Sequence, residues 1–229
     1  MKNPMNLHGK RILITGASSG IGRACAVLVS QLGGKVVLAG RDETRLKETE
    51  KMLEGEGHTI VAFDLRDFDI YSSIFKEIRS TGDKLSGMIH CAGIAKVIPV
   101  KVISVQNIAE VMETNYVSFM KLVKHYSKRT NSDGGSIVCL SAVNAHYPQK
   151  CMSIYAASKG ALEMAAMSLA VELYEKNIRV NTVIPGPIHT PMAQGFSEMA
   201  SGESDIIGRQ LMELGEPEDI ANMAAYLLS

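Results

Sequence analysis

The sequence contains no tryptophan, and aromatic residues make up only 5% of its 229 residues. No charge sign dominates, because 24 Lys and Arg residues balance 24 Asp and Glu residues. A balanced total gives no electrostatic reason to expect a nucleic acid or an anionic membrane as a partner. No apolar run approaches the length of a membrane span, and residues 1–10 contain lysines but no apolar signal core. We therefore expect a cytoplasmic protein without nucleic-acid or membrane partners.

Grouped metal ligands and paired cysteines are also missing. The four cysteines show no CxxC spacing and mostly lie in apolar stretches, which is typical of buried thiols rather than of disulfides or metal ligands. The six histidines form no HxxxH or HxxH pair. The sequence therefore predicts no metal site.

The length and the 46% hydrophobic content are those of one ordinary globular domain, spanning residues 1–229. Short apolar stretches that read as strands alternate with helix-forming stretches, which is typical of a parallel sheet covered on both faces. The expected strands are residues 11–15, 35–39, 59–63, 87–91, 136–141 and part of 177–184. The expected helices are residues 23–32, 43–54, 69–80, 108–128 and 153–176, and a last one begins near residue 216.

A glycine-rich turn follows the first expected strand, with Gly16, Gly20 and Gly22 in the order GxxxGxG. A strand, a glycine-rich turn and a helix together present free backbone N–H groups and a positive helix end to a pyrophosphate. Glycine permits the turn, the close approach of the phosphates and the close packing of helix on strand. This arrangement favours dinucleotide binding over a purely structural turn.

The end of the second strand bears on the choice of dinucleotide. Gly40 stands where an acidic residue would bind the adenosine ribose, and Arg41 follows it. Since an arginine there can pair with a 2′-phosphate, we expect NADP(H), with NAD(H) still possible. The alternative is that Arg41 is solvated or paired with Asp42 or Glu43.

Further residues come at the carboxyl ends of later strands, where open α/β sheets bind ligands. Asp64 and Leu65 could lie beside an adenine, although Asp64 could instead cap the next helix. The small residues Ala92 and Gly93 would let a cofactor pass close to the backbone. Ser141 ends the fifth strand on the same side.

The Ala-rich helix over residues 153–176 carries Tyr155 and Lys159 four positions apart, so that they share a face. A neighbouring cation favours the anion of a tyrosine, which makes the pair a candidate for proton transfer. In isolation, a buried tyrosine and a solvated lysine would be the simpler interpretation. Asn115, inside an apolar helix, is either a core asparagine bonded to backbone or a residue that holds a water near the site.

Together these motifs resemble the short-chain dehydrogenase/reductase family in its form of about 250 residues. The resemblance covers nearly the whole chain, and within the family it is strongest to 3-oxoacyl-[acyl-carrier-protein] reductases. The motifs that carry it are Thr15 to Gly22, Cys91-Ala92-Gly93, Asn115, Ser141, Tyr155-Ala156-Ala157-Ser158-Lys159, and Pro185-Gly186 with Thr190.

The resemblance implies a single-domain Rossmann fold and an Asn115, Ser141, Tyr155 and Lys159 catalytic tetrad. Tyr155 would exchange a proton with the substrate oxygen, Lys159 would bind the nicotinamide ribose and lower the tyrosine pKa, and Ser141 would bond the substrate oxygen. Asn115 would position a water that links Lys159 to solvent. The cofactor site implied by motif and resemblance comprises Gly16, Ser18, Ser19, Gly20, Ile21, Gly22, Arg41, Asp64, Leu65, Cys91, Ala92, Gly93, Tyr155, Lys159, Pro185, Gly186, Ile188 and Thr190.

The sequence departs from the family pattern in two places that matter. Cys91 stands where the family usually has asparagine, so the adjacent turn would lack that side chain's hydrogen bonds. The family's last helix is commonly followed by a seventh strand, and this sequence stops before it, so either the sequence is a truncated form or the sheet has six strands. The resemblance further implies a homo-oligomer, either a dimer or a tetramer.

The expected function is the NADP(H)-dependent exchange of hydride between nicotinamide and a ketone or secondary alcohol, with a 3-oxoacyl thioester as the expected substrate. The alternatives are a sugar, polyol or hydroxysteroid substrate, or a non-catalytic dinucleotide-binding sensor or scaffold. Residues 192–212, rich in Met, Gly and Ser, would cover the substrate.

Overall fold

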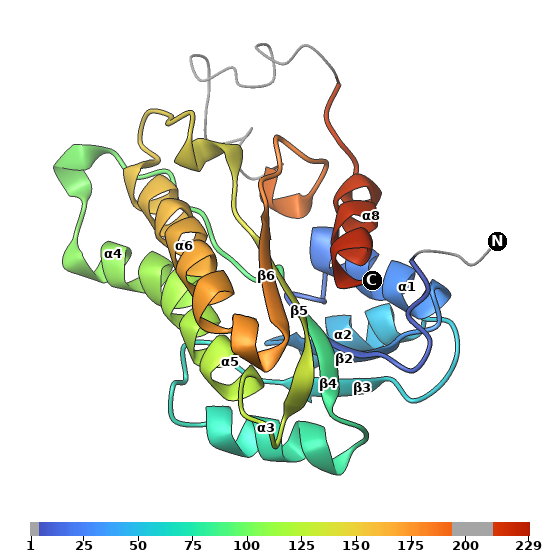
Figure 1. Ribbon diagram of the computed structural model, residues 1–229. Helices are drawn as coiled ribbons and strands as arrows, with labels where there is room; N and C mark the ends of the chain where they lie inside the picture. Colours follow the sequence, from blue (N-terminus) through green and yellow to red (C-terminus); the bar gives the residue numbers. More distant parts are fainter. Residues whose placement is uncertain (1–4, 194–212) are drawn as a thin grey trace.

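The computed structural model describes residues 5–193 and 213–229. Within them the chain forms one six-stranded parallel sheet with the strand order β3-β2-β1-β4-β5-β6 (Figure 1). The strands are β1 (Arg11–Thr15), β2 (Lys35–Gly40), β3 (Thr59–Ala62), β4 (Leu85–His90), β5 (Ser132–Leu140) and β6 (Ile178–Val183). The predicted fold class is confirmed. Of the expected substrate-covering segment, all but Met192 and Ala193 lies outside the described residues.

Helices cover both faces of the sheet (Figure 1). They are α1 (Gly20–Gln31), α2 (Glu43–Glu50), α3 (Tyr71–Ser80), α4 (Val105–Met112), α5 (Ser118–Tyr126), α6 (Ser153–Glu172) and α8 (Pro217–Leu228). The α3, α5 and α6 side chains Phe75, Phe119 and Leu162 belong to one buried cluster. The α1 and α8 side chains Val29 and Leu228 belong to a second buried cluster on the other face. The doubly wound arrangement therefore produces two cores that share the sheet.

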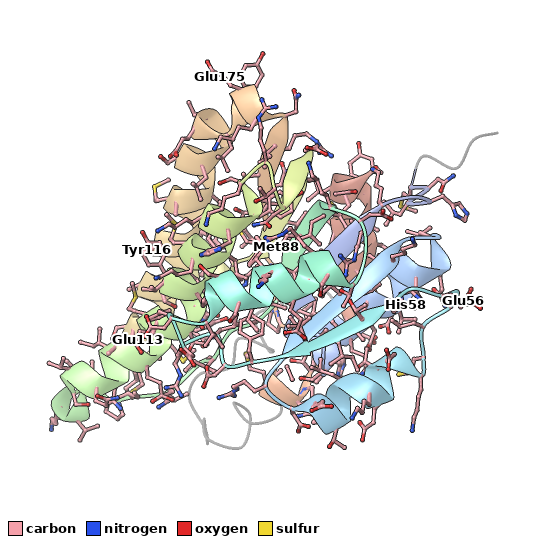
Figure 2. The ribbon with its side chains drawn as sticks, turned by 90° about the horizontal axis from the view of Figure 1, so that it is seen from below. Glu56, His58, Met88, Glu113, Tyr116 and Glu175 are labelled. Atoms are coloured by element: carbon pink, nitrogen blue, oxygen red, sulfur yellow. The ribbon has the colours of Figure 1, made fainter. Side chains whose placement is uncertain are left out.

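The strands contain continuous apolar stretches because both faces of the sheet are covered by helices. All five residues of β1 are buried, and Ile14 lies between Leu38 of β2 and Ile89 of β4. Figure 2 shows Met88 of β4 in the interior, whereas Glu56 and Glu175 lie at the periphery. The uninterrupted apolar stretches in the sequence are thus a direct consequence of the parallel sheet.

The expected helix over residues 108–128 differs from the structure in its start and its continuity. It begins at Val105, where Ser104 accepts a hydrogen bond from the N–H of Asn107 and caps the first turn. A π-helical turn, Glu113–Val117, then separates α4 from α5 and contains the buried Asn115. Single π-helical turns inside α-helices are frequent at functional sites, and propensities do not predict them.

Other boundaries shift for local reasons. Helix α2 ends at Glu50, short of the expected residue 54, and the chain then passes Gly55 and Gly57 with φ of +85° and +82°. Strand β5 begins at Ser132, four residues earlier than expected, and pairs with β4 across a register shift. Among the described residues, no helix has the length and apolar character needed to cross a membrane.

Candidate functional site

A cavity of about 750 Å³ opens at the carboxyl ends of the strands, on either side of the point where β1 and β4 are neighbours. Every residue expected to bind a cofactor contributes to its wall, and so does Ser141. Chain segments far apart in the sequence therefore converge on one site, as the edge of a doubly wound sheet allows. Asn115 does not line the cavity and lies behind its wall.

The glycine-rich turn has a backbone conformation that only glycine adopts readily. Gly16 and Gly20 have φ of +68° and +50°. A Cβ atom on Gly22 would lie 2.2 Å from the carbonyl oxygen of Gly16, closer than any real contact. Glycine at position 22 thus lets the start of α1 pack directly on the turn, so that the N-terminus of the helix lies beside the cavity, where an anionic pyrophosphate could bind. The residues present fit a dinucleotide.

Two side chains hold the carbonyl groups of this turn away from the cavity. The Thr49 hydroxyl donates to the carbonyl oxygen of Ala17 at 3.0 Å, and Arg23 donates to that of Ser18 at 2.7 Å. Arg23 also donates to the Thr49 hydroxyl at 3.0 Å. With these acceptors satisfied from behind, the donor groups of the turn are the ones left for an anion.

The wall at the end of β2 is basic. Gly40, Arg41 and Arg45 line the cavity there, so a second arginine joins the one that the sequence suggested. Asp42 accepts a hydrogen bond from the N–H of Arg45 and caps α2, whereas Glu43 pairs with Lys47 at 2.7 Å. The two acidic neighbours are thus engaged elsewhere, and Arg41 forms no ion pair within the described part of the chain.

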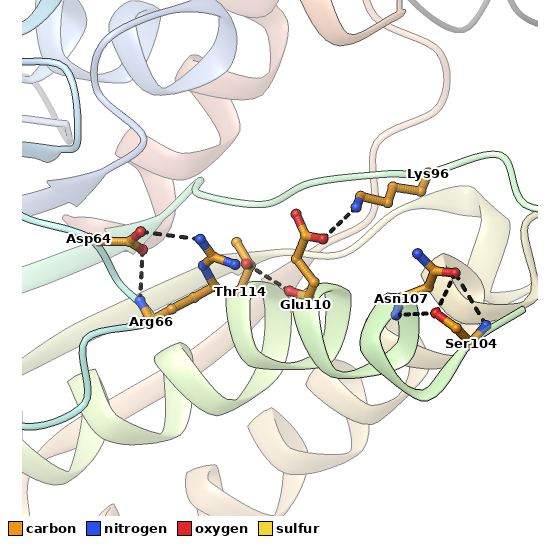
Figure 3. A network of polar contacts seen from close by, with 7 residues as sticks. All are labelled: Asp64, Arg66, Lys96, Ser104, Asn107, Glu110 and Thr114. Atoms are coloured by element: carbon orange, nitrogen blue, oxygen red, sulfur yellow. Dashed lines mark hydrogen bonds and ion pairs between the residues drawn. The ribbon is translucent and has the colours of Figure 1, made fainter.

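Asp64 stabilises its own turn rather than capping the next helix. Its side chain accepts a hydrogen bond from the N–H of Arg66 at 2.9 Å and pairs with the Arg66 guanidinium (Figure 3). Burial alone would raise the pKa of Asp64, but the bonds from Arg66 and the charges of Arg66 and Arg41 lower it. The same figure shows Lys96 paired with Glu110 on α4. Asp64, which lines the cavity, is therefore already paired with a neighbouring cation.

Tyr155 and Lys159 lie one turn apart on α6, and both are almost fully buried. The Lys159 Nζ atom lies 5.8 Å from the centre of the Tyr155 ring and donates to the carbonyl oxygen of Leu140 at 2.6 Å. Gly93 approaches from the opposite wall, and a Cβ atom there would lie 3.4 Å from Nζ. A phenol and an ammonium thus face the same small volume.

The protonation of this pair differs from the sequence-based expectation. Burial raises the pKa of Tyr155 to about 12 rather than letting the cation lower it. Burial also lowers the pKa of Lys159 to about 8, against the smaller opposing effects of Cys139, Cys91 and Glu163. Burial has this effect on both groups because it disfavours the charged form of each. In this structure Tyr155 is a protonated phenol at neutral pH.

Ser141 follows β5 directly, and its N–H donates to the carbonyl oxygen of Val183 at 2.9 Å. Its hydroxyl is hydrogen-bonded to Oε1 of Glu163, which lies one turn beyond Lys159 on α6. The other carboxylate oxygen, Oε2, lies 2.8 Å from Nε2 of His146. The serine therefore carries a partner that no sequence motif suggested.

Asn115 is fully buried and its side-chain amide is fully used. Its oxygen accepts the N–H of Ile94 at 2.8 Å, and its nitrogen donates to the Ile94 carbonyl oxygen and to the Ser158 hydroxyl, each at 2.9 Å. Of the two interpretations left open by the sequence, the side chain matches the core asparagine bonded to backbone. It fixes the segment after Gly93 against α6, directly behind Lys159.

The turn after β4 is held without the asparagine that Cys91 replaces. The N–H of Ala92 donates to the Thr15 hydroxyl at 3.3 Å, and the same hydroxyl bonds Nδ1 of His90 at 2.9 Å. Burial is the main cause that lowers the His90 pKa to about 3, so the ring is neutral at physiological pH. A neutral histidine thus ties β1 to β4.

The loop after β6 lies over the glycine-rich turn. A Cβ atom on Gly20 would lie 3.3 Å from the Thr190 methyl group. The N–H of His189 donates to the Gly215 carbonyl oxygen at 2.8 Å, which ties the loop to the segment before α8. Pro185, Gly186, Ile188 and Thr190 all contribute to the cavity wall.

Residues that sequence reasoning missed are Arg45, His90, His146 and Glu163. Arg45 comes four residues after Arg41, and Glu163 comes four residues after Lys159 on the same helix. This spacing could have pointed to both residues in the sequence. His90 and His146 belong to no motif, because their partners come from other elements. Among the described residues, no group of three His, Cys, Asp or Glu side chains is arranged to hold a metal ion.

The chain resembles known proteins over most of its length. Residues 16–229 match the family model described as enoyl-(acyl carrier protein) reductase. Carbonyl reductase family member 4 of Danio rerio is 32% identical over 216 residues, covering 94% of this chain and 90% of that protein.

Solved structures resemble the fold over almost its full length. A short-chain type dehydrogenase/reductase of Mycobacterium ulcerans superposes with a TM-score of 0.88 at 27% identity, covering 98% of this chain and 84% of the other. A short chain dehydrogenase of Mycobacterium paratuberculosis, solved bound to NAD, has a TM-score of 0.85 at 29% identity, covering 98% and 92%.

Replacement of Lys159 tests the pKa caused by its burial. The Lys159 pKa falls from the ordinary 10.5 to about 8 on folding, so between these values the unfolded chain keeps a proton that the folded protein has lost. Wild-type stability therefore rises with pH in this window relative to Lys159→Met, by about 3 kcal/mol in total. Urea unfolding of both proteins at pH 7 and pH 10.5 measures the difference. The exposed Lys101→Met serves as control, and a Lys159→Met difference that does not change with pH would contradict the assignment.

Proposed function

Since the chain belongs to the short-chain dehydrogenase/reductase family of oxidoreductases, we propose that it reduces a carbonyl group with NADPH and that a 3-oxoacyl thioester is its substrate. The observation that carries this proposal is the protonated Tyr155 phenol beside Lys159 and Ser141, on the wall of a cavity that also contains the glycine-rich turn. When bound, the nicotinamide supplies or accepts the hydride. The chain's own residues supply the proton, the charge stabilisation and the orientation.

Tyr155 is proposed as the general acid. A phenol whose pKa is raised to about 12 stays protonated at neutral pH and can donate to a carbonyl oxygen that gains negative charge. As the phenolate forms, the Lys159 ammonium, held by the Leu140 carbonyl group, stabilises its charge from within the same volume. Ser141 would donate a second hydrogen bond to the same oxygen. In the oxidative direction the proton returns to Tyr155.

Asn115 is proposed to hold the residues around Lys159 in place rather than to take part in proton transfer. Its amide fixes Ile94 and Ser158, which flank the Lys159 side chain, and the π-helical turn places part of its backbone outside the regular α-helical ladder. The water expected to connect Lys159 with solvent would bind to this backbone, because the side chain is already engaged.

The preference for NADPH is supported by the basic wall at the end of β2. Two guanidinium groups, Arg41 and Arg45, contribute to the cavity where Gly40 removes the acidic side chain that would bind a 2′-hydroxyl. A 2′-phosphate would meet both arginines, and their acidic neighbours are engaged in a helix cap and an ion pair.

The thioester proposal is supported by the apolar wall beside Tyr155. Ala142 and Met152 are buried against the Tyr155 ring, and Ala95 and Val97 pack on the same cluster. An acyl chain fits such a wall, whereas a sugar or polyol would leave its hydroxyl groups unbonded there. The family description, which names an acyl carrier protein, is in line with this choice. The non-catalytic alternative has no need of a Tyr155 and Lys159 pair on the cavity wall.

A homo-oligomer is proposed from the outer face of α6. Met164, Met167, Val171 and Tyr174 form a stripe at helical spacing and are between 60% and 81% exposed. Large apolar side chains gathered on one helix face are typical of a surface covered by another subunit.

Tyr155→Phe removes only the hydroxyl group. We expect kcat to fall by a factor of about 10³ or more with little change in NADPH affinity, because the acid is lost while the ring still packs. The measurement is NADPH oxidation with 3-oxoacyl thioesters, simple ketones, keto-sugars and ketosteroids as substrates. Tyr226→Phe, at an exposed position of α8, is the matched control. Undiminished turnover in Tyr155→Phe would remove this residue from the mechanism.

Arg41→Asp replaces the proposed phosphate ligand with a carboxylate. Its kcat/KM with NADPH should fall by about 10- to 100-fold, because a charge-assisted hydrogen bond becomes a repulsion, while that with NADH holds or rises. Steady-state kinetics with both cofactors test this, with the exposed Arg129→Asp as control. If the ratio of the two efficiencies stays the same, Arg41 does not bind the 2′-phosphate.

Met167→Glu and Val171→Glu together place two charges on the exposed stripe of α6. We expect sedimentation velocity to show a smaller assembly than for the wild type, since charges are disfavoured in the centre of an interface. The control is Met52→Glu, which is similarly exposed but lies beyond α2. A monomeric wild-type protein would contradict the proposed oligomer.

A further inference from the structure

The Ser141 hydroxyl has a carboxylate partner inside the cavity wall. Glu163 comes four residues after Lys159 and eight after Tyr155, so all three side chains occupy one face of α6. Oε1 of Glu163 is hydrogen-bonded to Oγ of Ser141, and the Glu163 side chain is only 14% exposed. The residue thus belongs to the same face as the proposed acid and its cation.

His146 engages the other oxygen of this carboxylate. It follows the short turn Val143–Ala145, and its Nε2 lies 2.8 Å from Oε2 of Glu163. The carboxylate therefore stands between the serine and the histidine. This differs from an acyl-transfer triad, in which the histidine itself bonds the nucleophilic hydroxyl.

The single proton of the Ser141 hydroxyl cannot be donated to both Glu163 and a substrate oxygen. A serine hydroxyl has one proton, and an ionised carboxylate can only accept hydrogen bonds. With Glu163 ionised, the Ser141 proton points toward Oε1, and Oγ offers only lone pairs to the cavity. The role proposed for Ser141 requires the same proton to point toward the substrate oxygen.

We propose that Glu163 is a positioning residue that sets the direction in which Ser141 donates its proton. An ionised Glu163 holds the proton away from the substrate oxygen, whereas a neutral group at this position that donates to Oγ releases the proton toward it. The inference rests on the proposed function, because it concerns the bond from Ser141 to the substrate. The titratable groups that face Glu163 are His146, Lys159 and Cys139.

Glu163→Gln tests the direction of the bond. In the Nε2–H tautomer, which is the one that can bond an ionised carboxylate, His146 keeps the amide oxygen on its side, so the amide nitrogen faces Ser141 and can only donate. Ser141 is then free to donate into the cavity, because its remaining acceptor in the wall, the Lys159 carbonyl oxygen, lies at a long 3.4 Å from Oγ. We expect kcat for carbonyl reduction to rise by about two- to tenfold, the value of one recovered hydrogen bond, with KM and NADPH affinity nearly unchanged.

A double-mutant cycle separates this role from a structural one. Ser141→Ala should lower kcat by about two- to tenfold more in the Glu163→Gln background, where Ser141 donates into the cavity, than in the wild-type background. If Glu163 acts through Ser141, Glu163→Gln has no effect on kcat in the Ser141→Ala background. Glu172→Gln, the same change at an exposed position of α6, is the matched control and should leave both kcat and KM unchanged.

The outcomes are distinct. A Glu163→Gln protein with kcat at or below the wild-type value, or with the same effect in both backgrounds, overturns the inference and leaves the proposed function intact. Should Glu163→Gln fail to fold, Glu163→Leu also removes the acceptor, and a fall in its kcat overturns the inference. A wild-type protein without Tyr155-dependent turnover overturns both.

Discussion

The hydrogen bond from Lys159 to the Leu140 carbonyl group fixes the geometry on which the site depends. It joins α6 to the end of β5 at 2.6 Å, and both groups are buried. Because Ser141 follows Leu140 directly and Tyr155 lies one turn before Lys159, the bond sets the distance between the hydroxyl and the phenol. Burial and this bond together restrict the Lys159 side chain. The site is therefore ordered by the strand end rather than by flexible surface loops.

The same burial explains the protonation states. Removing solvent raises the pKa of Tyr155 and lowers that of Lys159, so both groups move toward their neutral forms. A neutral phenol beside an ammonium that is easily deprotonated is suited to giving up a proton only when charge appears nearby. The cavity thus favours proton transfer that is coupled to charge development on a bound oxygen, and it disfavours a free phenolate.

The sequence predicts those parts of the site whose chemistry is local. The turn with Gly16, Gly20 and Gly22 and the pair Tyr155 and Lys159 are each encoded by spacing along one segment, and the structure places all five on one cavity. The Tyr155 pKa could not be predicted, because it depends on desolvation by residues from other elements, such as Ala95, Val97 and Ala142. For the same reason the π-helical turn and the contacts of His90 and His146, which depend on other elements, leave no pattern in the sequence.

The strand order places the residues for dinucleotide binding and the residues for proton transfer in different halves of the sheet. Strands β1 and β2 and the turns after them form the basic, glycine-rich side of the cavity, whereas β5 and α6 supply Ser141, Tyr155, Lys159 and Glu163 within 23 consecutive residues. The chemical groups are thus fixed by one strand and one helix, and residues 142–152 between them form the wall that a substrate meets. Changes in that wall can alter which carbonyl compound binds without moving the proton donor, because the bond between Lys159 and Leu140 holds the two ends of the segment together.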